Sequence, residues 1–130
     1  MRAILLMTVA CIGTMTSAAA QSISAADASK HVGEHATVCG QIAGEHTAYR
    51  SRGTPTFINL DKPYPNQVFT ILIWGDYRSS VGQFPASGRV CVAGTITEYR
   101  STPEIVVRDA QSWYVPPEYS LHLIEEAEIR

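Results

Sequence analysis

The residues VFTILIW at positions 68–74 make the clearest strand pattern of the chain, apolar except for Thr70 and followed by Gly75. A run rich in β-branched and aromatic residues that stops at a glycine is typical of a buried strand. Four further short patterns of this kind are found at residues 37–42, 56–60, 89–99 and 104–108. One helical turn is expected at residues 76–81. The sequence therefore predicts five strands, with a helical connection between the third and the fourth.

Glycines lie inside the first and the fourth predicted strands, at Gly40 and Gly94. Strands that close into a small barrel must bend, and glycine permits a bend or bulge. A five-stranded Greek-key barrel of this size, with short helices, is the OB-fold. We therefore predict an all-β OB-fold barrel over residues 36–109. Its first strand would neighbour its fourth.

Two shorter segments flank the predicted barrel. Residues 21–35 form a lead-in with a short helix, which Ser24 can cap and Gly33 can end. Residues 110–130 form a C-terminal tail, in which residues 118–129 could make another short helix. No repeat and no second domain is indicated, because about 110 residues suffice for one small domain.

Residues 1–20 have the order of a cleavable secretory signal peptide. Arg2 precedes a short apolar stretch, and the segment ends in three alanines at residues 18–20. A membrane anchor is the competing interpretation, but the apolar stretch is shorter than the ~20 residues that span a bilayer. A lipoprotein signal that acylates Cys11 is a second alternative. The prediction is a periplasmic or secreted protein without a membrane span in its mature chain.

Removal of residues 1–20 changes both the charge and the cysteine count. It takes away Arg2, so 9 of the 10 Lys and Arg face 12 Asp and Glu, a net charge of −3. A dedicated high-affinity nucleic-acid binder carries a strong positive excess instead. It also takes away Cys11, and the remaining Cys39 and Cys91 favour a disulfide in an exported protein. The alternative is a pair of buried free thiols.

Several segments resemble a family of small exported bacterial OB-fold proteins, whose members are described as nucleic-acid-binding-like. The segments are VCG at 38–40, PTFINL at 55–60, PYPNQVFT at 63–70, IWG at 73–75 and CVAGTI at 91–96. The similarity covers residues 24–107. It implies the fold, and a nucleic-acid-binding role follows from it by analogy between folds.

A ligand-binding OB-fold uses the face of its second and third strands, between the loops that join strands 1 to 2 and 4 to 5. Aromatic rings stack on bases there, and arginines follow the phosphates. Alternation along the strands places Phe57 and Asn59 on one face with Thr70 and Trp74. The candidate ligand-binding residues are Tyr49, Arg50, Arg52, Phe57, Asn59, Thr70, Trp74, Tyr99 and Arg100. In the alternative interpretation, the N-terminal helix or the tail at residues 113–114 covers this face.

Signals for catalysis and metal binding are weak. The carboxylates Glu45, Asp61, Asp76 and Glu98 are scattered, whereas a nuclease would need them clustered around a metal. His31 and His35 are four residues apart, but the expected helix ends between them. We therefore expect neither an enzyme nor a metal or other cofactor.

Two functions follow from these patterns. The leading hypothesis is an exported module that binds single-stranded nucleic acid, or another extended polymer, through the face of strands 2 and 3. The alternative is a structural or protein-interaction module of the cell envelope, whose partner would be an envelope protein. The first requires an exposed aromatic and basic face, and the second does not.

Overall fold

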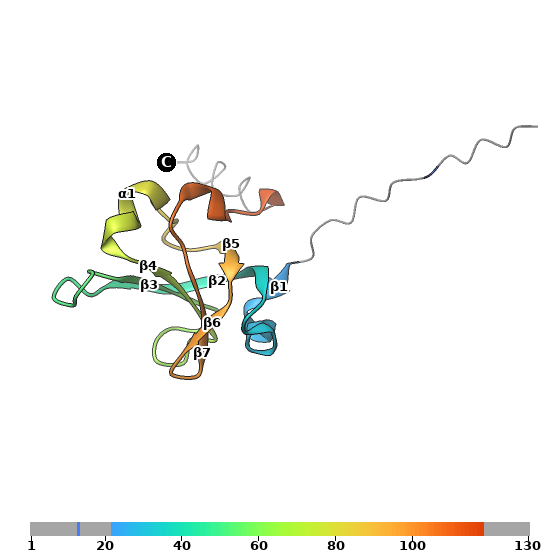
Figure 1. Ribbon diagram of the computed structural model, residues 1–130, viewed down its shortest axis with the longest axis horizontal. Coiled ribbons are helices and arrows are strands. Elements are labelled where there is room, and N and C mark those ends of the chain that lie inside the picture. Colours follow the sequence, from blue (N-terminus) through green and yellow to red (C-terminus); the bar gives the residue numbers. More distant parts are fainter. Residues whose placement is uncertain (1–12, 14–21, 119–130) are drawn as a thin grey trace, which may run out of the picture.

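The computed structural model describes Gly13 and residues 22–118. Apart from Gly13, the predicted signal peptide, including Cys11, therefore lies outside the described residues, as does nearly all of the predicted C-terminal helix. Within residues 22–118, one sheet of eight strands curls into a half-barrel, and short helices lie at either end of it (Figure 1).

The five predicted strands are present, but the total of five is wrong. They correspond to β2 (His35–Thr47), β3 (Thr56–Leu60), β4 (Phe69–Ile73), β5 (Arg89–Thr95) and β7 (Thr102–Val106). The additional strands are β1 (Ile23–Ser24), β6 (Thr97–Tyr99) and β8 (Trp113–Tyr114). The predicted strand at 89–99 is divided at Ile96 into β5 and β6, and the backbone of Ile96 hydrogen-bonds to Gly33 and Glu34 before β2.

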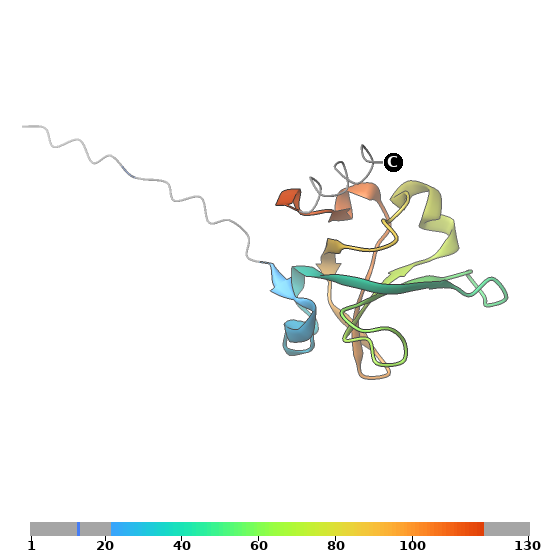
Figure 2. The ribbon, with the colours of Figure 1, turned by 180° about the vertical axis from the view of Figure 1, so that it is seen from behind.

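Strand β2 belongs to both halves of the barrel. Its residues 35–41 pair with β5, and its residues from Ile42 to Thr47 pair with β3. The register shifts between Ile42 and Gly44, two residues beyond the bend expected at Gly40. The order β6-β7-β4-β3-β2-β5-β8, with β4 and β7 parallel, gives an OB-like barrel. Figure 2 shows the length of β2 from behind.

The inward side chains of the strands form one apolar core. They include Val38, Ile58, Leu60, Phe69, Ile71, Val90, Val92 and Ile105, each at most 1% exposed. Val107, directly after β7, joins this core and is also fully buried. Burial of this apolar surface is the main force that holds the curled sheet closed.

The predicted N-terminal helix is confirmed, as the 3-10 helix η1 (Ala25–His31). Ser24 caps it, because its Oγ accepts a hydrogen bond from the backbone N–H of Asp27 at 3.2 Å. Ala25 and Ala28 are buried in the core. The helix therefore seals one end of the barrel.

The segments after β4 and β7 seal the other end. The chain leaves β4 through η2 (Gly75–Tyr77) and α1 (Arg78–Val81), and it leaves β7 through η3 (Ala110–Ser112). Trp113 stacks on Phe84 at a ring distance of 4.0 Å, and its Nε1–H donates to the Val81 carbonyl at 2.9 Å. The described part of the tail thus packs against α1 and β5.

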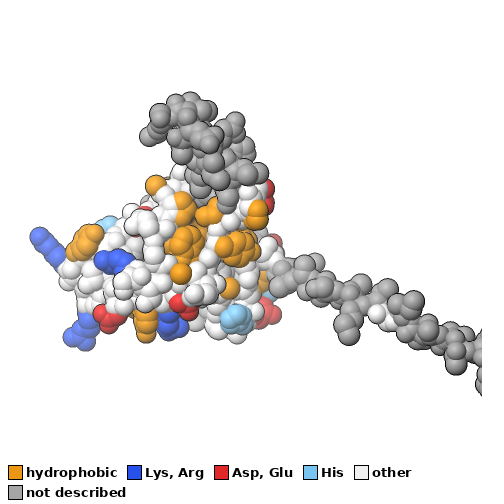
Figure 3. All heavy atoms as spheres, turned by 90° about the horizontal axis from the view of Figure 1, so that it is seen from above, with side chains coloured by type: hydrophobic (Ala, Val, Ile, Leu, Met, Phe, Trp, Pro, Cys, Tyr) orange, Lys and Arg blue, Asp and Glu red, His pale blue; other side chains and the backbone are white. Residues whose placement is uncertain are grey.

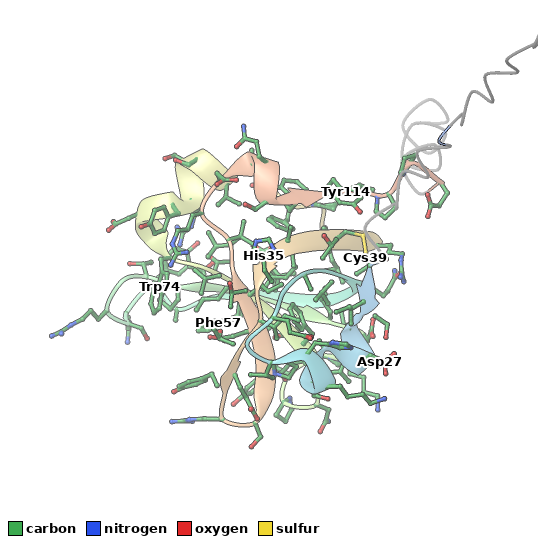
Figure 4. All side chains as sticks on the ribbon, turned by 45° about the vertical axis from the view of Figure 1, so that its right-hand side comes forward. Asp27, His35, Cys39, Phe57, Trp74 and Tyr114 are labelled. Carbon is green, nitrogen blue, oxygen red and sulfur yellow. A yellow bond between two sulfur atoms is a disulfide. The ribbon has the colours of Figure 1, made fainter. Side chains whose placement is uncertain are left out.

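The predicted disulfide is confirmed. Cys39 on β2 and Cys91 on β5 lie directly opposite each other, with their Cα atoms 4.1 Å apart, and they are joined through their sulfurs. Both residues are buried. Figure 4 shows the bond beside Cys39.

Gly94 lies in a closely packed part of the sheet, whereas Gly44 does not, and substitution of each glycine by alanine tests this difference. A Cβ at Gly94 would lie 2.7 Å from Cγ2 of the fully buried Ile105, whereas a Cβ at Gly44 would meet nothing within 4 Å. Gly94→Ala is expected to lower the free energy of unfolding by about 1–2 kcal/mol, as overpacking does. Gly44→Ala is the matched control, with a change expected within about 0.5 kcal/mol. Urea denaturation measures both, and equal midpoints for the two variants would contradict the packing argument.

Candidate functional site

The side chains that alternate with the core residues of β3 and β4 share one outer surface. Phe57 pairs with Leu72, and Asn59 pairs with Thr70. Ile58, which lies between Phe57 and Asn59 on β3, points inward and is 1% exposed. Phe57, Asn59, Thr70 and Leu72 therefore lie on one side of the sheet.

The same surface continues onto β7, because Leu72 pairs with Val106 and Thr70 pairs with Glu104. Two rows result, which run across the three strands. The apolar row consists of Phe57, Leu72 and Val106, and the polar row consists of Asn59, Thr70 and Glu104. We call these six residues the outer face.

The outer face has a buried floor and more accessible margins. Asn59, Thr70 and Leu72 are each 5% exposed, whereas Phe57 and Glu104 are half-buried. Gly44 on β2 stands opposite Asn59 and leaves open space where a side chain would lie. Of the predicted contact residues on this face, Phe57 is thus better placed to touch a ligand than Asn59 or Thr70.

The loop between β2 and β3 carries three of the predicted residues. Tyr49, Arg50 and Arg52 are exposed, and Tyr49 has 76% of its surface accessible. In Figure 3 the basic side chains gather toward the end of the molecule that bears this loop. Because these side chains point into solvent, they are free to contact a ligand.

Trp74 lies at the base of this loop. A Cβ at Gly53 would lie 2.8 Å from Cε3 of Trp74, so the indole packs directly on the loop backbone. The N–H of Gly75 donates to the Gly53 carbonyl at 2.8 Å, and Nη2 of Arg78 donates to the Thr54 carbonyl at 2.9 Å. Trp74, which is 38% exposed, therefore supports the loop as well as presenting part of its ring.

The hairpin of β6 and β7 carries the remaining two predicted residues. Tyr99 is 59% exposed, and the Arg100 guanidinium lies 5.3 Å from the centre of its ring. Arg100 and Ser101 form the two-residue turn and have φ values of 48° and 66°. Two successive positive φ angles indicate a type I′ turn, which favours Asn and Gly. The turn thus holds Arg100 in a conformation that costs free energy.

Figure 4 places Phe57 on the sheet between the Trp74 region and the end of the β6–β7 hairpin. The two aromatic and basic loops therefore flank the outer face, as they do in a ligand-binding OB-fold. Trp113 and Tyr114 pair with β5 instead of covering this face.

Glu104 also lies on the outer face, although it is not among the candidate ligand-binding residues predicted from the sequence. Burial raises the pKa of its carboxyl above the usual range. The ion pairs among the described residues are Lys30–Asp27 and His31–Glu34. Glu104 therefore forms no ion pair with a Lys, Arg or His of the described part of the chain. The sequence pattern that indicates this position of Glu104 is the alternation at 102–106. Pro103 and Ile105 point inward, and Glu104 between them lies on the outer face.

A cavity of about 170 Å³ is lined by residues of β2, β3 and β4, by Tyr49 of the β2–β3 loop and by the α1 region, and none of the six outer-face residues lines it. Its walls are Glu45, Thr47, Tyr49, Thr56, Ile58, Ile73, Arg78, Gly82, Gln83 and Phe84. Typical small-molecule sites have about 300–1,000 Å³. The cavity is smaller than such sites, and it shares Tyr49 with the candidate ligand-binding residues.

Within Gly13 and residues 22–118, no three His, Cys, Asp or Glu side chains gather into a group that could hold a metal ion. The helices in that part of the chain are too short or too polar to cross a membrane.

Neither a protein-family model nor a curated protein matches this chain. Solved structures do. A Leishmania major Friedlin protein assigned as an aspartyl-tRNA synthetase superposes with a TM-score of 0.51 and 15% identity over 82% of this chain. The chain spans only 22% of that protein. The Stn1–Ten1 complex of S. pombe gives a TM-score of 0.45 and 16% identity, covering 73% of this chain and 74% of that one.

The fold is OB-like. The strand order supports this assignment, and the likeness to the Leishmania protein agrees with it at the level of fold alone.

Proposed function

We propose that this protein is an exported, non-enzymatic OB-fold module that binds single-stranded nucleic acid, or another extended polymer, across its outer face. The observation that carries the proposal is the pair of loops on either side of that face. Each loop presents an exposed tyrosine together with arginine, as Tyr49 with Arg50 and Arg52, and as Tyr99 with Arg100.

These groups fit the two parts of a nucleotide chain. Guanidinium groups attract phosphates, and aromatic rings stack on bases irrespective of their identity. With arginines on the loops and the apolar row of Phe57, Leu72 and Val106 between them, the bases would face the sheet. The phosphates would then pass along the loops.

The charge of the chain limits how strong this binding is. The net charge of the mature chain is −3, so only the local basic groups favour an anionic polymer. We expect affinity that is modest and falls steeply with salt, because each neutralised phosphate releases counterions. Export rests on the pattern of residues 1–20, and the Cys39–Cys91 disulfide is compatible with an oxidising compartment.

Fluorescence anisotropy with a labelled dT12 oligonucleotide tests the proposal at low and at physiological salt. We expect binding at low salt, and the double substitution Arg50→Ala with Arg52→Ala should weaken it. Removal of two phosphate contacts should also flatten the slope of log K against log salt by about 1.4.

Lys30→Ala with Arg89→Ala is the matched control, because it removes two positive charges from η1 and from the start of β5. This control should keep the wild-type slope. An absence of binding at low salt would favour the envelope interaction module instead. Equal slopes for both double variants would show that the β2–β3 loop is not the contact surface.

A further inference from the structure

Glu104 has a position that phosphate binding does not explain. Its carboxylate lies in the polar row of the outer face, it is half-buried, and it takes part in neither ion pair of the described residues. A negative charge there repels phosphate, and desolvation without a partner costs free energy. A face that served only to attract phosphates would bind them more tightly without this negative charge.

A hydrogen-bond acceptor at this position can instead contact the edge of a base. We propose that Glu104 makes the outer face selective for guanine in a single-stranded nucleic acid. This inference rests on the function proposed above and specifies its ligand.

The donor pattern of guanine is the reason for this choice. Its Watson–Crick edge carries two adjacent donors, N1–H and the 2-amino group, which match the two oxygens of a carboxylate. Cytosine and adenine present one amino group next to an acceptor nitrogen. Thymine presents one N–H between two carbonyl oxygens. Single strands leave this edge free for such contacts.

The rows of the outer face are spaced for this arrangement. Glu104 and Val106 are two residues apart on β7, so the polar and apolar rows lie about 7 Å apart. A base that packs on Val106, the member of the apolar row on the same strand as Glu104, can therefore direct its edge at Glu104. Thr70 pairs with Glu104 but is only 5% exposed and forms the floor beside it, so Glu104 is the member of this pair that a base can reach.

The test compares dT12 with oligonucleotides in which one central dT is replaced by dG, dA, dC or deoxyinosine. Anisotropy titrations at one low salt concentration give the affinities. For the wild type we expect the dG oligonucleotide to bind roughly tenfold more tightly than dT12. Inosine lacks the 2-amino group, and it should lose most of that gain.

Glu104→Gln should bring the dG and dT12 affinities to within about twofold of each other, because an amide cannot accept two parallel hydrogen bonds. The matched control is Glu98→Gln. Glu98 lies on the same hairpin but pairs with Pro103, whereas Glu104 pairs with Thr70 in the polar row. It removes the same charge and should keep the guanine preference.

Three outcomes separate the inference from the function on which it rests. If no oligonucleotide binds, the proposed function fails and the inference falls with it. If all the oligonucleotides bind the wild type within twofold, the function stands and the guanine preference is overturned. A preference that survives in Glu104→Gln would overturn the role of Glu104. The inosine comparison tests the contact with the 2-amino group on the wild-type protein, without any variant.

Discussion

Replacement of both Cys39 and Cys91 by alanine should lower the free energy of unfolding by about 4 kcal/mol, the largest stability effect expected in this chain. The bond joins residues separated by 52 positions, and it thereby restricts a large loop in the unfolded chain. The chain-entropy model gives about 4 kcal/mol for a loop of this length. Urea denaturation of the oxidised wild type and of the double variant measures the difference.

The reduced wild type separates the crosslink from the packing of the sulfurs. Both cysteines are buried, at 4% and 2% exposure, so alanine also removes buried volume. Reduced protein keeps both sulfur atoms and loses only the bond. We expect it to account for most of the loss. If it stayed within about 1 kcal/mol of the oxidised protein, restriction of the unfolded chain would not be the main effect of the bond.

The barrel strands could be predicted from sequence because their apolar runs are long enough to form a pattern. Strands β1 and β8 have two residues each and exist only through pairing with β2 and β5. Their formation depends on partners that are distant in the chain. No local pattern of residues therefore indicates them.

Gly40 and Gly94 were predicted as bends, but the structure shows them as points of close approach. A Cβ at Gly40 would lie 3.0 Å from the Cβ of Ala25, and one at Gly94 would press on Ile105. A glycine in a strand is compatible with either role. Only the position of the neighbouring element decides between them.

The candidate site was predictable in its residue types and in its alternation. The exposed tyrosines and arginines of the two loops follow from the expected topology. The burial of Asn59 and Thr70 does not follow from the topology, because it depends on the side chains of adjacent strands. Glu104 was missed because a glutamate between apolar residues is typical of a solvent-exposed position, whereas here it is half-buried on the outer face.

Replacement of the β6–β7 turn by Asn-Gly, through Arg100→Asn with Ser101→Gly, should stabilise the fold and weaken binding at the same time. Arg100 and Ser101 both have positive φ, at a cost of roughly 1 kcal/mol or more for each residue. Asn and Gly suit this turn, so we expect a gain of about 2 kcal/mol in urea denaturation. Loss of the Arg100 charge should weaken dT12 binding roughly fivefold at low salt.

Ser101→Gly alone is the matched control for this turn. It relieves the strain at one position and leaves Arg100 in place, so it should gain about 1 kcal/mol and keep the wild-type affinity. Opposite signs for stability and binding in the double variant would mean that the strained turn is retained for the side chain it presents. Wild-type affinity in the double variant would instead remove Arg100 from the interface. The tip of the hairpin would then contribute at most through Tyr99, which both variants retain.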